Sequence, residues 1–313
     1  MSERGAPGRA TAFAPASVGN VAIGFDILGF AIAGLGDRVT VTRRAAAGVE
    51  IRAIRGVAGD LPREPRANTA GRALLAMQEA LDPGFGFTLE IDKGIPLASG
   101  LGGSASSAVA AVVAANALLA KPCAPLQLLK FALAGEATES SDRHVDNVAP
   151  SLFGGLVLTV GIDHPRVKQI PVPAGIRAVI VHPHMFVATS AARALLKRTV
   201  ELGDFVWQTA NLAGFISGCY TDDLDMIRAS LEDVVIEPQR QALIPGFQSI
   251  RRAAMHSGAL GCSISGSGPA MFAWAPEETA SAVLASMRAA FSAEGLVVDE
   301  WIVDLNCPGA HLT

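Results

Sequence analysis

Glycine and serine residues are concentrated in one segment, residues 93–107 (KGIPLASGLGGSASS), which precedes a long alanine-rich stretch. Gly100, Gly102 and Gly103 allow backbone N–H groups to approach an anion closely. A helix that begins at about Ser104 would add unsatisfied N–H donors and the positive end of its dipole. This pattern is suited to a loop that binds phosphate groups.

Three interpretations of this loop compete. A Walker loop requires Lys directly before the Ser or Thr that opens the helix, and no Lys precedes Ser104. A dinucleotide-binding turn is suggested by Gly100 and Gly102, but Pro96 lies in the turn and no acidic residue follows about 20 positions later to bind a ribose. A purely structural turn does not require hydroxyl groups, whereas a phosphate and metal site would use the serines at 99, 104, 106 and 107.

A second group of candidates consists of charged residues in apolar surroundings. Arg193 and Arg240 are isolated arginines, and a guanidinium is the natural bidentate partner of a carboxylate, although single arginines are more often solvated at the surface. Asp26 lies in the apolar run IGFDILGFAIAG, where an ionised carboxylate needs a partner. A ligand ammonium or hydroxyl and a backbone cap are both open as that partner.

The composition limits the class of protein. The chain has 313 residues, a net charge of −4 and 50% hydrophobic residues, which excludes intrinsic disorder and gives no reason to expect a nucleic-acid partner. The apolar run from Ala105 to Ala120 is too short and too polar to cross a membrane, so we expect no membrane partner. The four cysteines form no zinc or disulfide pattern, which predicts a cytoplasmic protein.

Alternating strand and helix patterns predict an α+β chain of about two domains. Asn68 is placed to cap a helix over residues 69–81. The other predicted elements are strands at 36–44, 49–54, 87–95, 151–160, 177–183, 261–275 and 296–305, and helices after residue 103, near residue 125, within 189–257 and over 276–295. A stretch rich in glycine and proline after Val160 places the domain boundary between residues 165 and 166, giving domains 1–165 and 166–313.

Three segments in the same order resemble the GHMP kinases, the small-molecule kinases named for galactose, homoserine, mevalonate and phosphomevalonate. PLASGLGGSAS (96–106) resembles their central ATP motif, APASVGNVAIGFDILG (14–29) their substrate motif and ISGSGPAMFA (264–273) their third motif. The resemblance implies a two-domain fold, with an N-terminal ATP-binding domain like ribosomal protein S5 domain 2 and a C-terminal ferredoxin-like domain.

Two further segments are similar to the homoserine kinase branch of this family, EATESSDRHVDNVAPSLFGG (136–155) and EPQRQALIPGF (237–247). The resemblance implies phosphorylation of the side-chain hydroxyl of L-homoserine by ATP with Mg²⁺, in threonine biosynthesis. It also suggests a homodimer.

The same resemblance implies roles for individual residues. It implies catalytic roles for Asn20, Glu136, Asn147 and Arg193, and a substrate pocket formed by Asn20, Asp26, His144, Asn147, Thr189, Arg193, Arg240 and Gly266. It implies that ATP contacts Asn68, Lys93, Pro96, Leu97, Ala98, Ser99, Gly100, Leu101, Gly102, Gly103, Ser104, Ala105 and Ser106, and that Mg²⁺ contacts Ser104 and Glu136. For His144, a structural role stays open.

Several relatives use an Asp as catalytic base, and the position that resembles it in this sequence is Asn147. Because phosphoryl transfer depends mostly on positioning and charge neutralisation, we expect direct in-line transfer without a strong base. Asp146 is the alternative base. The alternative functions are another kinase of the family acting on mevalonate or a sugar, a non-catalytic nucleotide-binding sensor, and an oxidoreductase that binds a dinucleotide.

Overall fold

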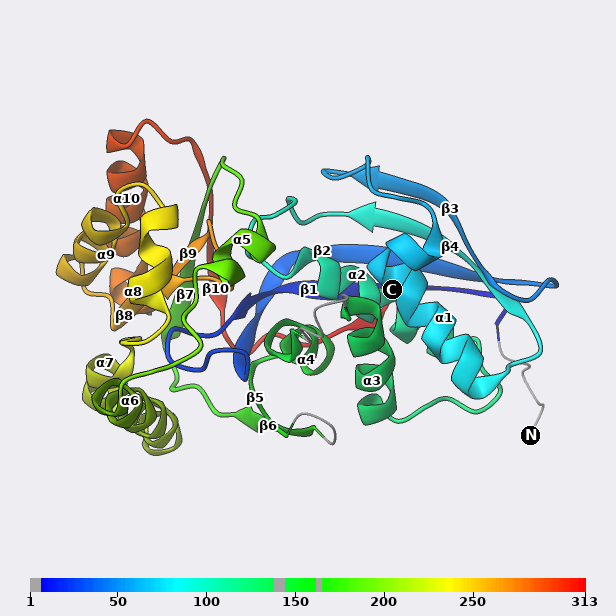
Figure 1. Ribbon diagram of the computed structural model, residues 1–313, viewed down its shortest axis with the longest axis horizontal. Coiled ribbons are helices and arrows are strands. Elements are labelled where there is room, and N and C mark those ends of the chain that lie inside the picture. The colour runs from blue at the N-terminus through cyan, green and yellow to red at the C-terminus, as the bar shows by residue number, and fades with distance from the viewer. Residues whose placement is uncertain (1–6, 138–143, 162–164) are drawn as a thin grey trace.

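The computed structural model describes residues 7–137, 144–161 and 165–313, which form two sheets with helices packed against them (Figure 1). The first sheet has the strand order β11-β1-β2-β4-β3, and β5 pairs with both β2 and β6. Its strands are β1 (Arg9–Gly19), β2 (Leu28–Arg44), β3 (Val49–Gly56), β4 (Gly86–Lys93), β5 (Leu156–Val160), β6 (Arg166–Ile170) and β11 (His311–Leu312).

Three helices pack against one face of this sheet: α1 (Thr69–Leu81), α2 (Gly103–Asn116) and α4 (Val145–Phe153). A fourth helix, α3 (Pro125–Glu136), packs on these three. The helix α2 is apolar on all sides and ten of its fourteen residues are buried. A helix with this pattern belongs in a protein core, because any exposed side would leave apolar surface in water. In the described part of the chain, no helix is long and apolar enough to cross a membrane.

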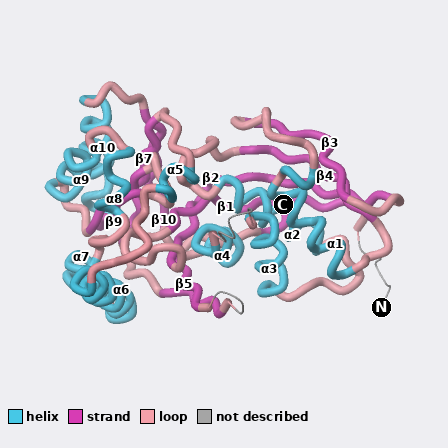
Figure 2. The backbone as a smooth tube through the Cα atoms, viewed as in Figure 1, coloured by secondary structure: helices cyan, strands magenta, loops and turns pink. Residues whose placement is uncertain are grey.

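The second sheet is antiparallel, with the order β10-β7-β9-β8. Its strands are β7 (Ile176–Pro183), β8 (Gly261–Ile264), β9 (Met271–Pro276) and β10 (Val298–Asp304). The helices of this half are α5 (Thr189–Ala194), α6 (Leu202–Thr221), α7 (Leu224–Ser230), α8 (Glu237–Arg240), α9 (Phe247–His256) and α10 (Glu277–Ala293). Figure 2 shows the helices of this half on both sides of its strands.

The alternation of side chains along β9 explains how this sheet can be covered on both faces. Phe272 and Trp274 belong to a core that also contains Phe30 of β2 and Phe215 of α6. The intervening residues of β9 belong to a separate core with α9 and α10. Because successive strand residues point to opposite faces, one strand contributes to both cores, and the first of these joins the two halves of the molecule.

Most of the predicted elements agree with the structure, including the helix over 69–81 with Asn68 as its N-cap. The predicted strand over 151–160 is wrong in its first half, because α4 continues to Phe153 and β5 begins only at Leu156. The division at residue 165 stays a prediction, although the structure places β6 in the first sheet and returns β11 to the edge of β1.

Candidate functional site

The glycine-rich segment forms the loop between β4 and α2. Gly100 and Gly102 have φ values of 78° and 66°, in the left-handed region that glycine adopts without steric cost. A Cβ atom on Gly102 would lie 2.2 Å from Ser17 Oγ. The close approach of Ser17 is therefore a second reason why position 102 requires glycine. Since Gly102 is the N-cap of α2, the first N–H groups of a fourteen-residue helix are directed at the end of this loop.

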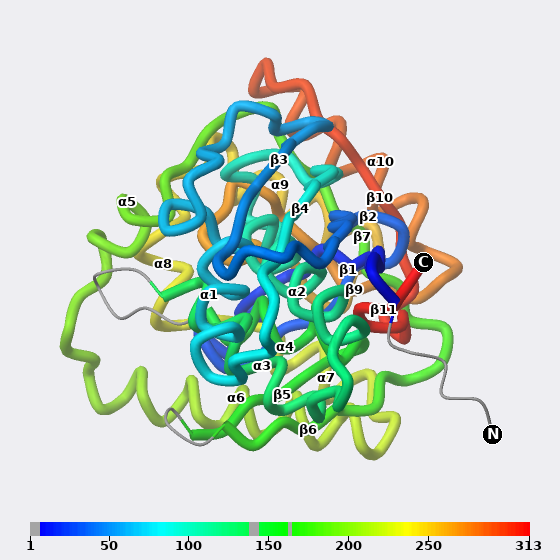
Figure 3. The backbone as a smooth tube through the Cα atoms, turned by 90° about the vertical axis from the view of Figure 1, so that its right-hand side faces the viewer, coloured from blue at the N-terminus to red at the C-terminus, as the bar shows by residue number. Residues whose placement is uncertain are grey.

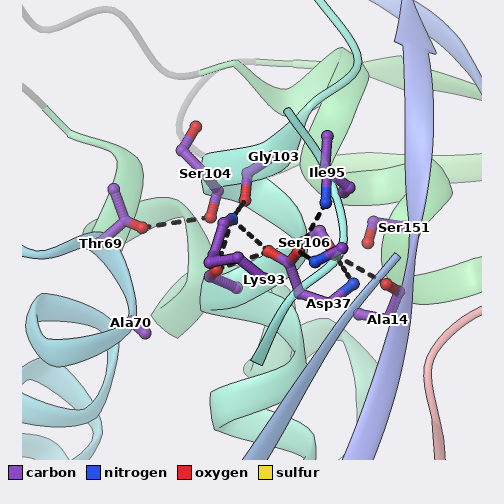
Figure 4. Close-up of polar contacts among 12 residues, drawn as sticks. Ala14, Asp37, Thr69, Ala70, Lys93, Ile95, Gly103, Ser104, Ser106 and Ser151 are labelled. Atoms are coloured by element: carbon purple, nitrogen blue, oxygen red, sulfur yellow. Dashed lines mark hydrogen bonds and ion pairs between the residues drawn. The ribbon is translucent and has the colours of Figure 1, made fainter. Parts of the chain in front are cut away.

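A buried ionic network holds the start of the loop (Figure 4). Lys93, the last residue of β4, pairs with Asp37 of β2, and its Nζ also donates to Gly103 O and Ser107 Oγ. Asp37 Oδ1 accepts from the backbone N–H of Gly94 at 3.0 Å. Asp37 is fully buried, and the sequence analysis did not identify it, because a single Asp in a strand pattern gives no sign of its partner.

The second half of the molecule holds the other side of the loop. Ser265 Oγ donates to Gly100 O at 2.7 Å, and the backbone N–H of Ala270 donates to Ser99 O at 3.0 Å. Gly266, in the same turn, donates its N–H to Gly19 O at the end of β1. The glycine-rich segment 264–273 therefore holds the loop at residues 96–104 in place, although the two are far apart in the sequence.

A hydroxyl and a carboxylate meet beside the first turn of α2. Ser104 Oγ donates to Glu136 Oε2 at 2.9 Å, and Glu136 is 4% exposed. Glu136 Oε1 is buried and makes no hydrogen bond within the described part of the chain. A carboxylate oxygen without a partner, next to a hydroxyl, is an oxygen donor set of the kind that suits a hard cation such as Mg²⁺.

His144 lies at the N-cap position of α4, with Nδ1 3.9 Å from Glu136 Oε2. The Glu136 carboxylate raises the pKa of His144 above its ordinary value, and Asp146 and Asp26 add to this effect against the opposing effect of burial. Most of the segment between Glu136 and His144, residues 138–143, lies outside the described residues. When protonated, His144 is therefore a cationic group beside the Ser104–Glu136 pair.

The opposite end of the site carries the two arginines that the sequence singled out. Arg193 Nη1 of α5 lies 2.7 Å from Asp26 Oδ2. Arg240 of α8 is 4% exposed and donates from Nη1 to Gly266 O at 3.1 Å. Burial lowers the pKa of Arg240, and the nearby charge of Arg193 lowers it further. Two guanidinium groups whose positive charges act on one another favour an anionic ligand between them.

Phe25 lies against both guanidinium groups. Its ring centroid is 5.2 Å from the Arg193 Cζ and 5.1 Å from the Arg240 Cζ, which is within the range of cation–π attraction. Phe25 and Asp26 belong to the connection between β1 and β2, so one short segment contributes an aromatic face and a carboxylate to the same pair of cations. Phe25 carries no chemical signal in the sequence, because an aromatic residue in an apolar run is expected to lie in the core.

The connection between β1 and β2 has a strained backbone. Asn20, Val21, Ala22 and Asp26 all have positive φ values, from 44° to 69°, which side-chain-bearing residues seldom adopt. The Asn20 side chain holds this conformation by accepting from Asp26 N at 3.1 Å and donating to Gly266 O at 2.9 Å. The strain fixes Asn20 and Asp26 in the wall of the site.

Asp146 and Asn147 of α4 lie between the two ends. Asp146 is buried, which together with the negative charge of Asp26 raises its pKa to about 6. Its Oδ2 accepts from the backbone N–H of Asn20 at 3.1 Å, and its Oδ1 accepts from Asn147 Nδ2 at 3.3 Å. Asn147 Oδ1 accepts from Ser17 Oγ at 3.0 Å, so both side chains are oriented by neighbours.

The loop, the Ser104–Glu136 pair, Asn20, Asp26, His144, Asp146, Asn147 and the two arginines line one cavity of about 350 Å³. The cavity brings together the following residues predicted from the sequence: Asn20, Asp26, Pro96, Leu97, Ala98, Ser99, Gly100, Leu101, Gly102, Gly103, Ser104, Glu136, His144, Asn147, Thr189, Arg193, Arg240 and Gly266. Thr189 Oγ1 lies 3.3 Å from Ser267 Oγ at the cavity wall. The binding role assigned to each of these residues stays a prediction.

Four of the predicted ATP contacts do not line the cavity: Asn68, Lys93, Ala105 and Ser106. Asn68 caps α1 by accepting from Ala70 N, and Ser106 Oγ donates to Ala14 O inside the core. Four further residues line the cavity and carry no signal of a site in the sequence: Thr69, Arg72, Ile95 and Ser267. Lining residues such as Arg72, whose Nε donates to Gly135 O at 2.8 Å, reach the cavity only through contacts between distant segments.

Comparison with known proteins matches two family models, the GHMP kinases N terminal domain at residues 68–155 and the GHMP kinases C terminal at residues 215–293. The chain is 49% identical to homoserine kinase of Xylella fastidiosa strain M12, with 97% of this chain and 94% of the relative covered. It is 43% identical to homoserine kinase of Chlorobium phaeobacteroides strain BS1, with 96% and 98% covered.

Among solved structures, a homoserine kinase from Cytophaga hutchinsonii superposes with a TM-score of 0.95 at 39% identity and covers 100% of both chains. Mevalonate kinase of L. major superposes with a TM-score of 0.68 at 17% identity, covering 97% of this chain and 99% of the other, which shows a shared fold alone.

Proposed function

The chain belongs to the GHMP kinase family, and we propose that it transfers the γ-phosphoryl group of ATP to the side-chain hydroxyl of L-homoserine, forming O-phospho-L-homoserine and ADP. This reaction is a step of threonine biosynthesis. The observation that carries the proposal is the pairing, in one cavity, of a phosphate-binding loop with two arginines and a carboxylate.

The chemistry of the cavity matches the three polar groups of homoserine. Arg193 and Arg240 provide donors for the substrate carboxylate, and Asp26 provides an acceptor for its ammonium. With these groups fixed, the primary hydroxyl at the far end of the substrate is directed toward the loop Pro96–Ser104. A mevalonate or sugar substrate has no ammonium group and would leave Asp26 without its ligand partner.

The residues at the other end suit ATP with Mg²⁺. The backbone N–H groups of the loop and of the first turn of α2 would bind the phosphates, and Ser104 and Glu136 would hold the metal. When bound, Mg²⁺ supplies positive charge that offsets the negative charge of the phosphate oxygens. Lys93 contributes indirectly, because its contact with Gly103 O holds the start of α2 in place.

We propose that the transfer needs no dedicated strong base. Asp146 is oriented by the hydrogen bonds that its two oxygens accept from Asn20 N and Asn147 Nδ2. The Asn147 amide cannot accept a proton at neutral pH. The contribution of these residues is to hold the hydroxyl in line with the phosphorus, which accounts for much of the rate in phosphoryl transfer.

The direct test is ADP formation by the purified protein with L-homoserine, mevalonate and galactose offered separately. We expect turnover with L-homoserine only. Arg240→Leu should raise the KM for L-homoserine roughly 30-fold or more, because loss of a buried charged partner costs about 2–5 kcal/mol. Arg252→Leu, at an exposed arginine of α9, is the matched control. Unchanged homoserine affinity in Arg240→Leu would remove the carboxylate assignment.

The Asp146→Asn variant tests the proposal that the transfer needs no general base. We expect this variant to retain most of its turnover. If turnover is abolished while ATP and L-homoserine still bind with wild-type affinity, Asp146 is the general base and direct transfer is wrong.

We also propose that the chain acts in the cytoplasm as a homodimer. The four cysteines are all free, as expected in a reducing compartment. The homodimer rests on the resemblance to this family.

A further inference from the structure

The first half of α6 carries an apolar surface that the rest of the described chain leaves uncovered. Five large apolar residues at the start of α6 and just before it are 47–76% exposed: Val200, Leu202, Phe205, Val206 and Trp207. Figure 3 shows α6, in yellow-green, running along the lower edge of the molecule. We call these five residues the α6 surface.

The second half of the same helix behaves differently. Phe215 and Cys219 are buried in the core between the two halves of the molecule, and Leu212 and Ile216 pack against that core. The helix is therefore anchored by its C-terminal half. Its N-terminal half extends the apolar character of the helix onto the surface.

The area of the α6 surface is large for a single chain. With roughly 200 Å² for the full accessible area of a large side chain, the five residues expose roughly 600 Å². This value is at the upper end of the largest apolar patch found on typical monomers, about 300–600 Å². It also supplies most of the roughly 800 Å² that each partner contributes to a stable protein–protein interface.

The charges around the α6 surface argue for a protein partner. Helices that lie on anionic membranes carry Lys and Arg on their polar face, whereas α6 contains neither residue. Two basic residues, Lys197 and Arg198, and two acidic residues, Glu201 and Asp204, flank the apolar residues. Within the described residues none of these four makes an ion pair.

We propose that two copies of this chain associate through the α6 surface about a two-fold axis. In such an interface the same residues meet their own copies, so an apolar patch flanked by equal numbers of basic and acidic side chains is complementary to itself. The proposal deepens, and rests on, the homodimer of the proposed function, because it names the residues that form the contact.

The α6 surface is also connected to the substrate end of the cavity. Gln208, the residue after Trp207, donates from Nε2 to Ile23 O at 3.0 Å and accepts at Oε1 from Val234 N at 3.0 Å. Ile23 lies in the strained connection that carries Phe25 and Asp26. A second copy packed on α6 would therefore hold the helix turn that contacts this connection.

The test measures the mass of the full-length protein by sedimentation velocity over a wide concentration range. We expect a species of about 64 kDa, twice the chain mass of 32.2 kDa. The double variant Phe205→Glu and Trp207→Glu should weaken association at least about 30-fold, as expected for the loss of interface hot spots. Val57→Glu is the matched control, because Val57 is a 63% exposed apolar residue in the other half of the molecule.

A second measurement uses the tryptophan itself and needs no disruptive variant. On dilution of the wild-type protein, the emission of Trp207 should shift to the red as this residue becomes exposed to water. Trp207→Phe should lose this shift and stay dimeric. A wild-type protein that is monomeric throughout, a double variant that stays dimeric, or a shift that persists in Trp207→Phe overturns the proposal. Kinase activity is assayed separately, so its absence would count against the proposed function and leave the dimer result unchanged.

Discussion

The two ends of the cavity are built differently. At one end, a single continuous segment from Pro96 to Ser104 lines the cavity, and its backbone N–H groups would bind the phosphates under the proposed function. At the other end, charged side chains meet from segments that are distant in the sequence: Asp26 and Arg193 are 167 residues apart. The loop depends on backbone conformation, whereas the arginine end depends on how the two halves of the molecule pack.

This difference suggests that each end can be damaged without the other. Substitutions in the loop or at the proposed metal ligands should act on ATP or on the chemical step. Substitutions around the arginines should act on L-homoserine. Substitutions at each end, and at Asp146 between them, can break that separation.

The largest effect is expected at Glu136, which belongs to the phosphate end. Glu136→Gln removes the negative charge next to Ser104, so kcat should fall about 10²–10³-fold, as when one preorganised electrostatic partner is lost. In a titration of Mg²⁺ at saturating ATP, the variant should need a higher Mg²⁺ concentration than wild type to reach half of its maximal activity. Glu79→Gln, at an exposed position of α1, is the control. A variant whose metal titration matches wild type would remove Glu136 from the metal site.

Gly102→Ala tests whether the loop geometry acts on ATP alone. The substitution places a Cβ at a φ of 66° and 2.2 Å from Ser17 Oγ, so the KM for ATP should rise about tenfold, from strain of about 1–3 kcal/mol. Gly175→Ala is a close control, since Gly175 has a φ of 75° and its added Cβ meets nothing within 4 Å. An equal rise in the KM for L-homoserine would mean that the two ends are not separable.

Phe25→Leu tests the arginine end by a change of substrate. Leucine keeps an apolar contact but loses the cation–π attraction, so the KM for L-homoserine should rise about 5- to 20-fold, from about 1–2 kcal/mol. With 3-aminopropan-1-ol, which lacks the carboxylate, wild type and variant should be equally poor. The ratio of the two substrates should therefore fall in Phe25→Leu, while the KM for ATP stays constant.

If both substrates lose activity in the same proportion, Phe25 has only a structural role. Phe25→Tyr retains an aromatic face and should recover most of the preference for the carboxylate.

Asp146, between the two ends, should affect stability more than turnover. Its pKa is raised to about 6 in the folded protein, so the folded state binds a proton more tightly than the unfolded state does. The contribution of this group to stability is therefore full below pH 4 and is lost as the pH rises through about 6. Asp146→Asn should raise the stability at pH 7.5 by roughly 2–3 kcal/mol and leave it unchanged at pH 4.

Thermal unfolding of the ligand-free protein at several pH values measures this difference. A variant that is less stable than wild type at pH 7.5 would contradict the prediction, and would show that the ionised carboxylate is stabilised by Asn20 and Asn147 more than burial destabilises it.

The conformation of the loop at the proposed phosphate end could be predicted from the sequence, because the residues that set it are close together in the chain. The glycines set the backbone conformation, the serines follow within a few residues, and the helix N-terminus is part of the same segment, so short-range physics is sufficient. The same reasoning predicted Asn68 as the cap of α1. It did not reveal that Lys93 faces inward, because its partner Asp37 lies 56 residues away.

Local sequence patterns were therefore sufficient to predict most of the elements, the glycine-rich loop and the charged residues that needed partners. The identity of those partners depends on the tertiary fold. Phe25 became part of the site because two arginines from the other half pack on it, and Thr69 and Arg72 reached the cavity because α1 packs beside α2. Burial and contact between distant segments depend on the packing of the whole chain, and the spacing of residues along the sequence does not contain that information.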